Sequence, residues 1–189
     1  SGSVFNLALS SNVAGSTYSW TANGTPGLAG FSGGNGNTIN QTILNSTNTP
    51  GTVIYTLTPT ANACSGLPVD YTLTVNPIPN VNLSLANQSV CSGTPTTAVT
   101  FSSSVAGTTY TWTAAPSGAG ITGYTASGSV SIPVQTINST LNTPGTVTYT
   151  ITPRFSGCTG TSTGHMVPIH PLPSVTTARI SQTICDGGN

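Results

Sequence analysis

The sequence predicts an all-β protein built from two tandem β-sandwich domains. Apolar residues alternate with threonine and serine in short runs, which is the pattern of half-buried strands. Clusters of glycine, proline, asparagine and serine separate these runs and permit turns, and no segment shows a helical period. The second half of the chain repeats the first at a nearly constant offset, so the 189 residues are expected to hold two copies of one module.

The expected strands follow one another in the same order in each copy. The clearest is the run 145–153, in which valine, tyrosine and isoleucine occupy every second position. The alternating apolar residues are, in chain order, Phe5, Leu7 and Leu9; Tyr18 and Trp20; Val53, Tyr55 and Leu57; Val99 and Phe101; Tyr110 and Trp112; and Val147, Tyr149 and Ile151. The core candidates among them are Trp20, Tyr55, Trp112 and Tyr149. A large aromatic ring in phase with other apolar residues packs inward far more often than it stacks on a sugar.

The expected sandwich is of the immunoglobulin-like type. Each copy has roughly seven short strands, a tryptophan on the third strand, and a Pro-Gly turn leading into the penultimate strand. These turns are Pro50-Gly51 and Pro144-Gly145. A β-barrel is the weaker alternative.

The repeat leaves two ways to divide the chain. The offset of 94 aligns Tyr55 with Tyr149, whereas the earlier offset of 92 aligns Trp20 with Trp112, so a two-residue insertion is expected in a loop. The preferred division gives residues 1–92 to the first immunoglobulin-like repeat and residues 93–189 to the second. The alternative places the boundary at 77–79, and residues 174–189 then open a third repeat.

The composition narrows the classes of function. The chain has two arginines, no lysine, two aspartates and no glutamate, which gives a net charge of zero. Without a basic patch it is not expected to bind nucleic acid, and without an apolar run near 18 residues it is not expected to insert into a membrane. No signal peptide is recognisable, so we expect an internal segment of a longer exported protein.

Each copy contributes two cysteines, which in a chain of extracellular character are expected to form disulfides. No Cys-x-x-Cys pair indicates a metal site, and no cofactor is expected. The preferred pairing joins Cys64 with Cys91 and Cys158 with Cys185, each bond closing a hairpin that turns at a Pro-x-Pro motif such as residues 77–79. The alternative joins Cys91 with Cys158; Pro-x-Pro also suits an extended linker between domains.

No catalytic residue is expected. Asp70 and Asp186, the only carboxylate side chains, fall in different repeats and leave no pair for general acid and base catalysis. His165 and His170 are five residues apart on an expected strand and therefore point to opposite faces. We interpret them as surface or strand-end histidines and expect no metal site.

Four segments of the sequence carry a family resemblance. They are residues 74–79 (TVNPIP), 89–93 (SVCSG), 109–113 (TYTWT) and 142–153 (NTPGTVTYTITP). The whole chain resembles the PKD-like repeats of giant surface proteins from gliding and related Bacteroidota. The resemblance implies export by the type IX secretion system, a long thread attached to the outer membrane, and adhesion to surfaces. The Asp-rich calcium loops of some PKD-like relatives are absent from this sequence.

The expected function is structural, and no enzyme activity is expected. The chain would serve as the stalk and attachment thread of a cell-surface adhesin, with a role in gliding motility. Its expected partners are neighbouring repeats of the same chain and, through other parts of the parent protein, the outer-membrane motility or secretion machinery. The alternatives are a module that binds polysaccharide or a solid surface through hydroxyl-rich strand faces, and a subunit of an extracellular fibre.

Overall fold

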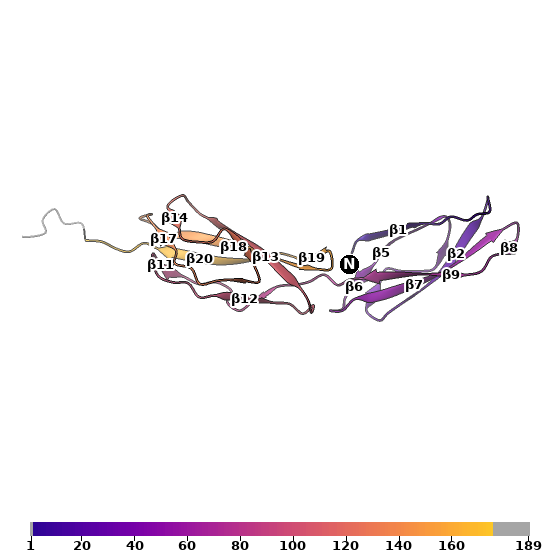
Figure 1. Cartoon of the computed structure of the whole chain (residues 1–189), viewed down its shortest axis with the longest axis horizontal. Coiled ribbons are helices and arrows are strands. Elements are labelled where there is room, and N and C mark those ends of the chain that lie inside the picture. Colours follow the sequence, from indigo (N-terminus) through magenta and orange to yellow (C-terminus); the bar gives the residue numbers. More distant parts are fainter. Residues whose placement is uncertain (1, 176–189) are drawn as a thin grey trace, which may run out of the picture.

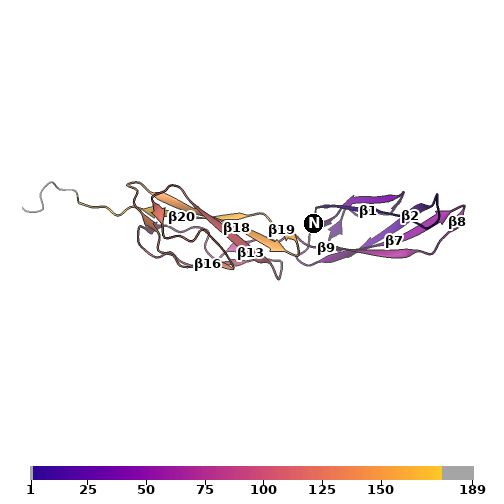
Figure 2. The ribbon, with the colours of Figure 1, turned by 45° about the horizontal axis from the view of Figure 1, so that its top comes forward.

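The computed structural model describes residues 2–175, which form two β-sandwich domains without a helix. Figures 1 and 2 show the two sandwiches arranged end to end along the long axis of the molecule. This arrangement confirms the expected all-β fold of two immunoglobulin-like domains.

The strands of the first domain lie between Val4 and Val75. They are β1 (Val4–Ala8), β2 (Thr17–Gly24), β3 (Leu28–Ala29), β4 (Gly34–Asn35), β5 (Thr38–Thr42), β6 (Leu44–Asn45), β7 (Gly51–Ala61), β8 (Cys64–Ser65) and β9 (Val69–Val75). The larger sheet has β7 at its centre, with β2 and then β4 on one side and β9 and the β8 hairpin on the other. Strands β1 and β5 form the opposing sheet, and β3 pairs with β6.

The strands of the second domain lie between Asn82 and His170. They are β10 (Asn82–Leu83), β11 (Val90–Cys91), β12 (Val99–Ser102), β13 (Thr109–Pro116), β14 (Ile121–Thr122), β15 (Ser127–Ser129), β16 (Ser131–Ile132), β17 (Asn138–Ser139), β18 (Gly145–Phe155), β19 (Cys158–Thr159) and β20 (Thr163–His170). The larger sheet runs β11-β20-β18-β13-β15, and the opposing sheet runs β10-β12-β16.

The two domains use the same strand register, as expected for two copies of one module. Trp20 of β2 lies opposite Leu57 of β7, and Trp112 of β13 lies opposite Ile151 of β18. The central strands β7 and β18 are long. Val53 and Tyr55 of β7 and Val147, Tyr149 and Ile151 of β18 fill the inner face, and threonine occupies most of the outward-facing positions between them.

Each domain has its own hydrophobic core. One cluster of buried residues contains Trp20 and Tyr55, and a second, separate cluster contains Trp112 and Tyr149. The indole rings are 8% and 3% exposed, so neither tryptophan offers a face on which a sugar could stack. Two independent cores mean that the halves are separate domains and not one continuous sandwich.

The chain does not turn back at residues 77–79, so the expected hairpin between residues 67–75 and 81–90 is wrong. After β9 the chain passes directly into the second domain, where β10 pairs with β12 and β11 pairs in parallel with β20. Residues 82–91, which the preferred division at 92 assigned to the first repeat, therefore pair with strands of the second. Strand alternation predicts that a segment is a strand, but it does not identify the partner.

The junction between the domains is closely packed. Pro77 is fully buried, and the Asn76 side-chain nitrogen donates to the Ser156 carbonyl oxygen at 3.3 Å. The Asn80 side-chain oxygen accepts three hydrogen bonds, from the Ser103 hydroxyl (2.9 Å) and from the backbone nitrogen (2.9 Å) and hydroxyl (2.8 Å) of Ser104. The Pro-x-Pro motif is therefore an extended linker that is fastened at both ends.

Candidate functional site

The cysteines that were expected to form disulfides lie far apart. Figure 1 places β8, with Cys64, at one end of the molecule and β11, with Cys91, at the other. Cys158 lies in β19, beside the domain junction. The thiols of these three residues are free, so neither the Cys64–Cys91 disulfide nor the alternative Cys91–Cys158 disulfide is formed. Cys185 lies outside the described residues, and its pairing with Cys158 stays a prediction.

His165 is buried, although a surface or strand-end position was expected. Its Nδ1 lies 2.8 Å from the Ala86 carbonyl oxygen and its Nε2 lies 3.2 Å from the Gln88 side-chain nitrogen. Because a carbonyl oxygen only accepts, Nδ1 carries the proton and Nε2 accepts from Gln88. His165 therefore fastens the segment before β11 to β20 and has no free nitrogen for a ligand. His170, on the opposite face, is exposed and contacts the Ser89 hydroxyl at 2.9 Å.

The buried tyrosines are structural hydrogen-bond donors. Tyr149 donates to the Gln135 side-chain oxygen at 3.0 Å, and burial raises the pKa of its phenol to about 12. Tyr55 makes the corresponding bond to Gln41 at 2.7 Å, and burial raises its pKa as well. Both phenols stay protonated at neutral pH, so neither serves as a base there.

Residues 2–175 contain no group of three or more histidine, cysteine or acidic side chains that could hold a metal ion. Asp70 accepts a hydrogen bond from the Thr56 hydroxyl at 2.7 Å on an exposed strand face, and Asp186 lies outside the described residues. Within the same range no helix could cross a membrane.

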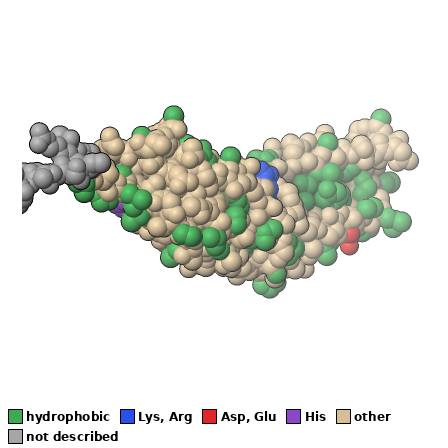
Figure 3. Space-filling model, turned by 60° about the vertical axis from the view of Figure 1, so that its left-hand side comes forward, with side chains coloured by type: hydrophobic (Ala, Val, Ile, Leu, Met, Phe, Trp, Pro, Cys, Tyr) green, Lys and Arg blue, Asp and Glu red, His purple; other side chains and the backbone are tan. Residues whose placement is uncertain are grey.

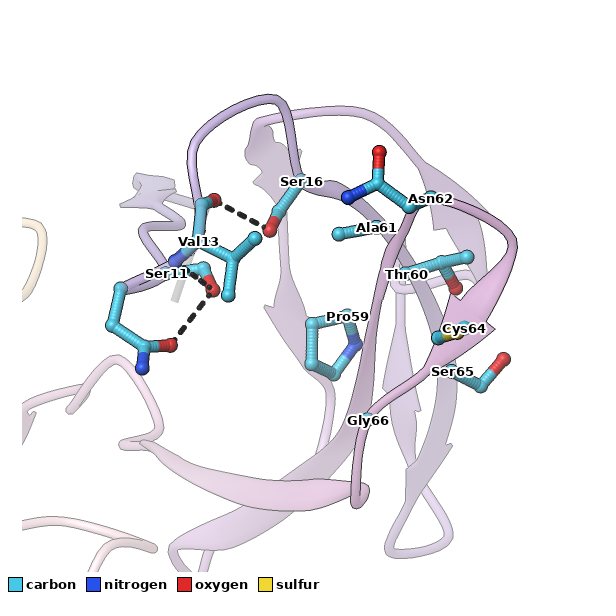
Figure 4. A pocket seen from close by; sticks show the side chains of 11 residues that line it. Ser11, Val13, Ser16, Pro59, Thr60, Ala61, Asn62, Cys64, Ser65 and Gly66 are labelled. Carbon is cyan, nitrogen blue, oxygen red and sulfur yellow. Dashed lines mark hydrogen bonds between the residues drawn. The ribbon is translucent and has the colours of Figure 1, made fainter.

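An open hollow of about 370 Å³, here named the end hollow, lies at the outer end of the first domain (Figure 4). The side chains of Val13 and Pro59 point into it, and Cys64 lies at its rim in the β7–β8 hairpin. The Ser16 hydroxyl donates to the Val13 carbonyl oxygen at 2.8 Å. Because no carboxylate or histidine lines the hollow, no base is present to activate a hydroxyl group there.

In the second domain the linker fills the place that corresponds to the end hollow. Val105, the counterpart of Val13 in the repeat, is 2% exposed, whereas Val13 is 44% exposed. Gly160 lies against the backbone of Pro79, and a Cβ atom at Gly160 would overlap the Pro79 carbonyl oxygen. The end hollow therefore corresponds to the place that the linker occupies in the second domain.

A second hollow of about 390 Å³, the side hollow, lies along the first domain and is lined by Leu9, Tyr18, Leu57 and Val69 among others. Figure 3 shows hydrophobic side chains gathered in a hollow of this domain. In the second domain, Leu83 and Leu85 pack against the corresponding side of the core, and Leu83 pairs with the residue that corresponds to Leu9.

A third hollow of about 240 Å³, the junction groove, runs beside β9. Apolar residues of the first domain and Cys158 of the second line it; they include Phe5, Ile43, Leu73 and Val75. In the second domain β11 occupies the corresponding place, because Val90 pairs with Ile169, which is the counterpart of Val75.

Sequence reasoning did not identify these three hollows. Strand alternation could not find them, because it does not identify which segment covers a strand. In the second domain, residues 77–91 fill the corresponding places.

Comparison with known proteins assigns the family. The family model described as the PKD-like domain matches residues 1–79 and 88–173, which correspond to the two sandwiches and cover most of the chain. A comparison with curated proteins found no match. PKD-like domains are commonly extracellular repeat or adhesion modules, and they are generally not catalytic. The two matched segments, each coinciding with one sandwich, show that this chain belongs to the PKD-like domain family.

Proposed function

We propose that the chain is a stalk segment of a long extracellular adhesin, which carries pulling force between the cell and the surface to which the cell adheres. In this proposal the parent protein is a gliding-motility adhesin that the type IX system exports and that is attached to the outer membrane. Neighbouring repeats are the direct partners of each domain, and the motility or secretion machinery contacts other parts of the parent protein.

The observation that carries the proposal is the parallel pairing of β11 with β20. These strands lie close to the two points where the chain enters and leaves the second domain, and they run in the same direction. The Gln88 backbone nitrogen donates to the Met166 carbonyl oxygen at 3.2 Å, and the Ser92 backbone nitrogen donates to the His170 carbonyl oxygen at 2.8 Å. Force applied at the two chain ends shears these bonds, so they must break together and not one after another.

The junction supports the same role. A stalk transmits force and keeps its reach only when its units do not fold back on one another. Here the linker is short, both of its prolines are buried, and asparagine side chains fasten it to the second domain. Proline also limits the backbone of the linker to extended conformations.

Single-molecule force spectroscopy tests this proposal, with the chain attached through its two termini. We expect two unfolding events, and the event at higher force should belong to the second domain, which has the parallel pair. Gln88→Pro removes the nitrogen that donates to Met166 and should lower only that force. The event of the first domain is the internal control. Two events of equal low force, or a high-force event that Gln88→Pro leaves unchanged, would contradict the stalk proposal.

A further inference from the structure

Cys91, here named the exit cysteine, lies at the end of the second domain where the chain leaves it. It pairs with His170, the last residue of β20, and the Ser92 backbone nitrogen donates to the His170 carbonyl oxygen at 2.8 Å. Val90, the preceding residue of β11, packs against the core, so strand alternation directs the Cys91 side chain outward. The exposed Cys91 thiol is therefore presented beside the point where residue 171 continues the chain.

Cys158, here named the hairpin cysteine, lies at the opposite end of the same domain, in the β18–β19 hairpin beside the first domain (Figure 1). The two thiols of one domain are therefore too far apart to bond to each other. The hairpin contacts the first domain through Asn76, whose side-chain nitrogen donates to the Ser156 carbonyl oxygen at 3.3 Å. Asn76 and Cys158 both line the junction groove.

The register of the repeat relates these two ends. Asn76 follows β9 in the place that His170 takes in β20, because the offset of 94 aligns the two residues. A segment that pairs with β9 as β11 pairs with β20 would lie about 5 Å from β9 and place its exit cysteine beside Asn76. That position lies in the junction groove, which the hairpin cysteine Cys158 lines.

Both kinds of cysteine recur in the two copies of the repeat. Cys64 corresponds to the hairpin cysteine Cys158, and Cys185 corresponds to the exit cysteine Cys91, each at an offset of 94. An array of such repeats therefore carries one cysteine of each kind per domain. At every junction the exit cysteine of one domain meets the hairpin cysteine of the next.

We propose that disulfide bonds join neighbouring repeats across their junctions. Cys91 bonds to the hairpin cysteine of the repeat that follows the second domain, and Cys158 bonds to the exit cysteine of the segment that pairs with β9 in the parent protein. This proposal rests on the proposed function, in which neighbouring repeats are the direct partners of each domain. The bond is a second covalent connection beside the Pro-x-Pro linker, so it holds the junction closed under a pulling force.

An oxidant of the disulfide class completes the reaction. The two thiols give up two protons and two electrons and form one S–S bond, while glutathione disulfide takes them up and becomes two molecules of glutathione.

The experiment uses the full chain with a second copy of residues 77–170 inserted after residue 170, which gives three domains in a row. Every cysteine is changed to serine except Cys91 of the second domain and Cys158 of the inserted domain. After oxidation with glutathione disulfide we expect a monomer without free thiols, in which peptide mapping identifies the bond between these two cysteines.

The matched control is the same three-domain chain that keeps Cys91 and Cys158 of the second domain instead. These thiols lie at opposite ends of one domain, so their bond should form at least about tenfold more slowly. Circular dichroism should show the same fold for both variants.

A second arrangement tests the junction between the two existing domains without an inserted domain. Residues 77–92 are placed directly before residue 1 of the full chain, and only the added copy of Cys91 and the native Cys158 are kept as cysteines. These two thiols should form a bond within the monomer.

Three results would overturn the proposal. The first is equally fast bond formation in the three-domain chain and in its control. The second is a product in which the two thiols react only between molecules. The third is a Cys158–Cys185 bond within one molecule of the unaltered chain. None of these measurements applies force, so the disulfide can fail its test while the stalk proposal passes its own.

Discussion

At the scale of single residues, each tryptophan is held by a backbone hydrogen bond and a glycine. The Trp112 indole nitrogen donates to the Ser131 carbonyl oxygen at 3.0 Å, and its ring covers Gly128 on the adjacent strand. A Cβ atom at Gly128 would lie 2.5 Å from the ring, and one at Gly34 would lie 2.9 Å from the ring of Trp20. Glycine is required at these positions because the ring occupies the space of a side chain.

Gly128→Ala should therefore destabilise the second domain by about 1–3 kcal/mol, because the added methyl group displaces a buried ring. Chemical denaturation followed by far-ultraviolet circular dichroism would measure the change. Gly164→Ala is the matched control, since a Cβ there meets no atom within 4 Å. Equal losses of stability in both variants would contradict the proposed overlap with Trp112.

The burial and packing of single residues were only partly predictable from the sequence. Alternation identified Trp20, Tyr55, Trp112 and Tyr149 as inward-facing, and these side chains are buried. It did not identify Gly128, because glycine in a polar segment has the same appearance as a turn residue. The burial of His165 was missed because its partners, the Gln88 amide and the Ala86 carbonyl, are distant from it in sequence.

At the scale of elements, β9 and β20 hold the same position in their sheets but differ in whether another strand covers their outer edge. Both pair with the central strand of their sheet in the same register, which the repeat predicted. Within residues 2–175, only β20 has a strand on its outer side. The sequence could not give this difference, because the alternation within a strand depends on its two faces and contains no information about its edges.

The fastening of β11 to β20 should depend on His165. His165→Ala removes a fully buried ring and the hydrogen bonds to Ala86 and Gln88, and we expect a loss of about 2–4 kcal/mol in the stability of the second domain. Hydrogen exchange should be faster at the backbone nitrogens of Gln88 and Ser92.

The control for this variant is His170→Ala, which removes an exposed side chain with one contact to Ser89. It should change the stability by no more than about 0.5 kcal/mol. If the two variants lose similar stability, the buried hydrogen bonds of His165 do not fasten the strand.

At the scale of the whole molecule, the repeat predicted two domains but not where one ends. The offset of the copies is the same wherever the boundary is drawn, so it cannot decide between residue 92 and residues 77–79. Strand pairing changes partner between Val75 and Asn82. The expected Cys64–Cys91 bond required residues 81–90 to run back alongside residues 67–75. Residues 82–91 pair with the second domain instead, so the two thiols lie at opposite ends of the molecule (Figure 1).

Asn80 should control how firmly the linker holds the second domain. Asn80→Ala removes the acceptor of three hydrogen bonds from Ser103 and Ser104, and should destabilise that domain by about 1–2 kcal/mol. Limited proteolysis should cut the variant faster at residues 77–80. Asn82→Ala, an exposed change in the next strand, is the control, and equal cleavage of both variants would contradict this role for Asn80.

The bonds that fasten the linker, from Asn76 to Ser156 and from Asn80 to Ser103 and Ser104, join amides and hydroxyls only. Dissolved ions weaken the attraction between charged groups, and none of these hydrogen bonds involves a charged group. The stiffness of the linker should therefore be the same at low and at high salt concentration, which suits the proposed role of an extracellular stalk.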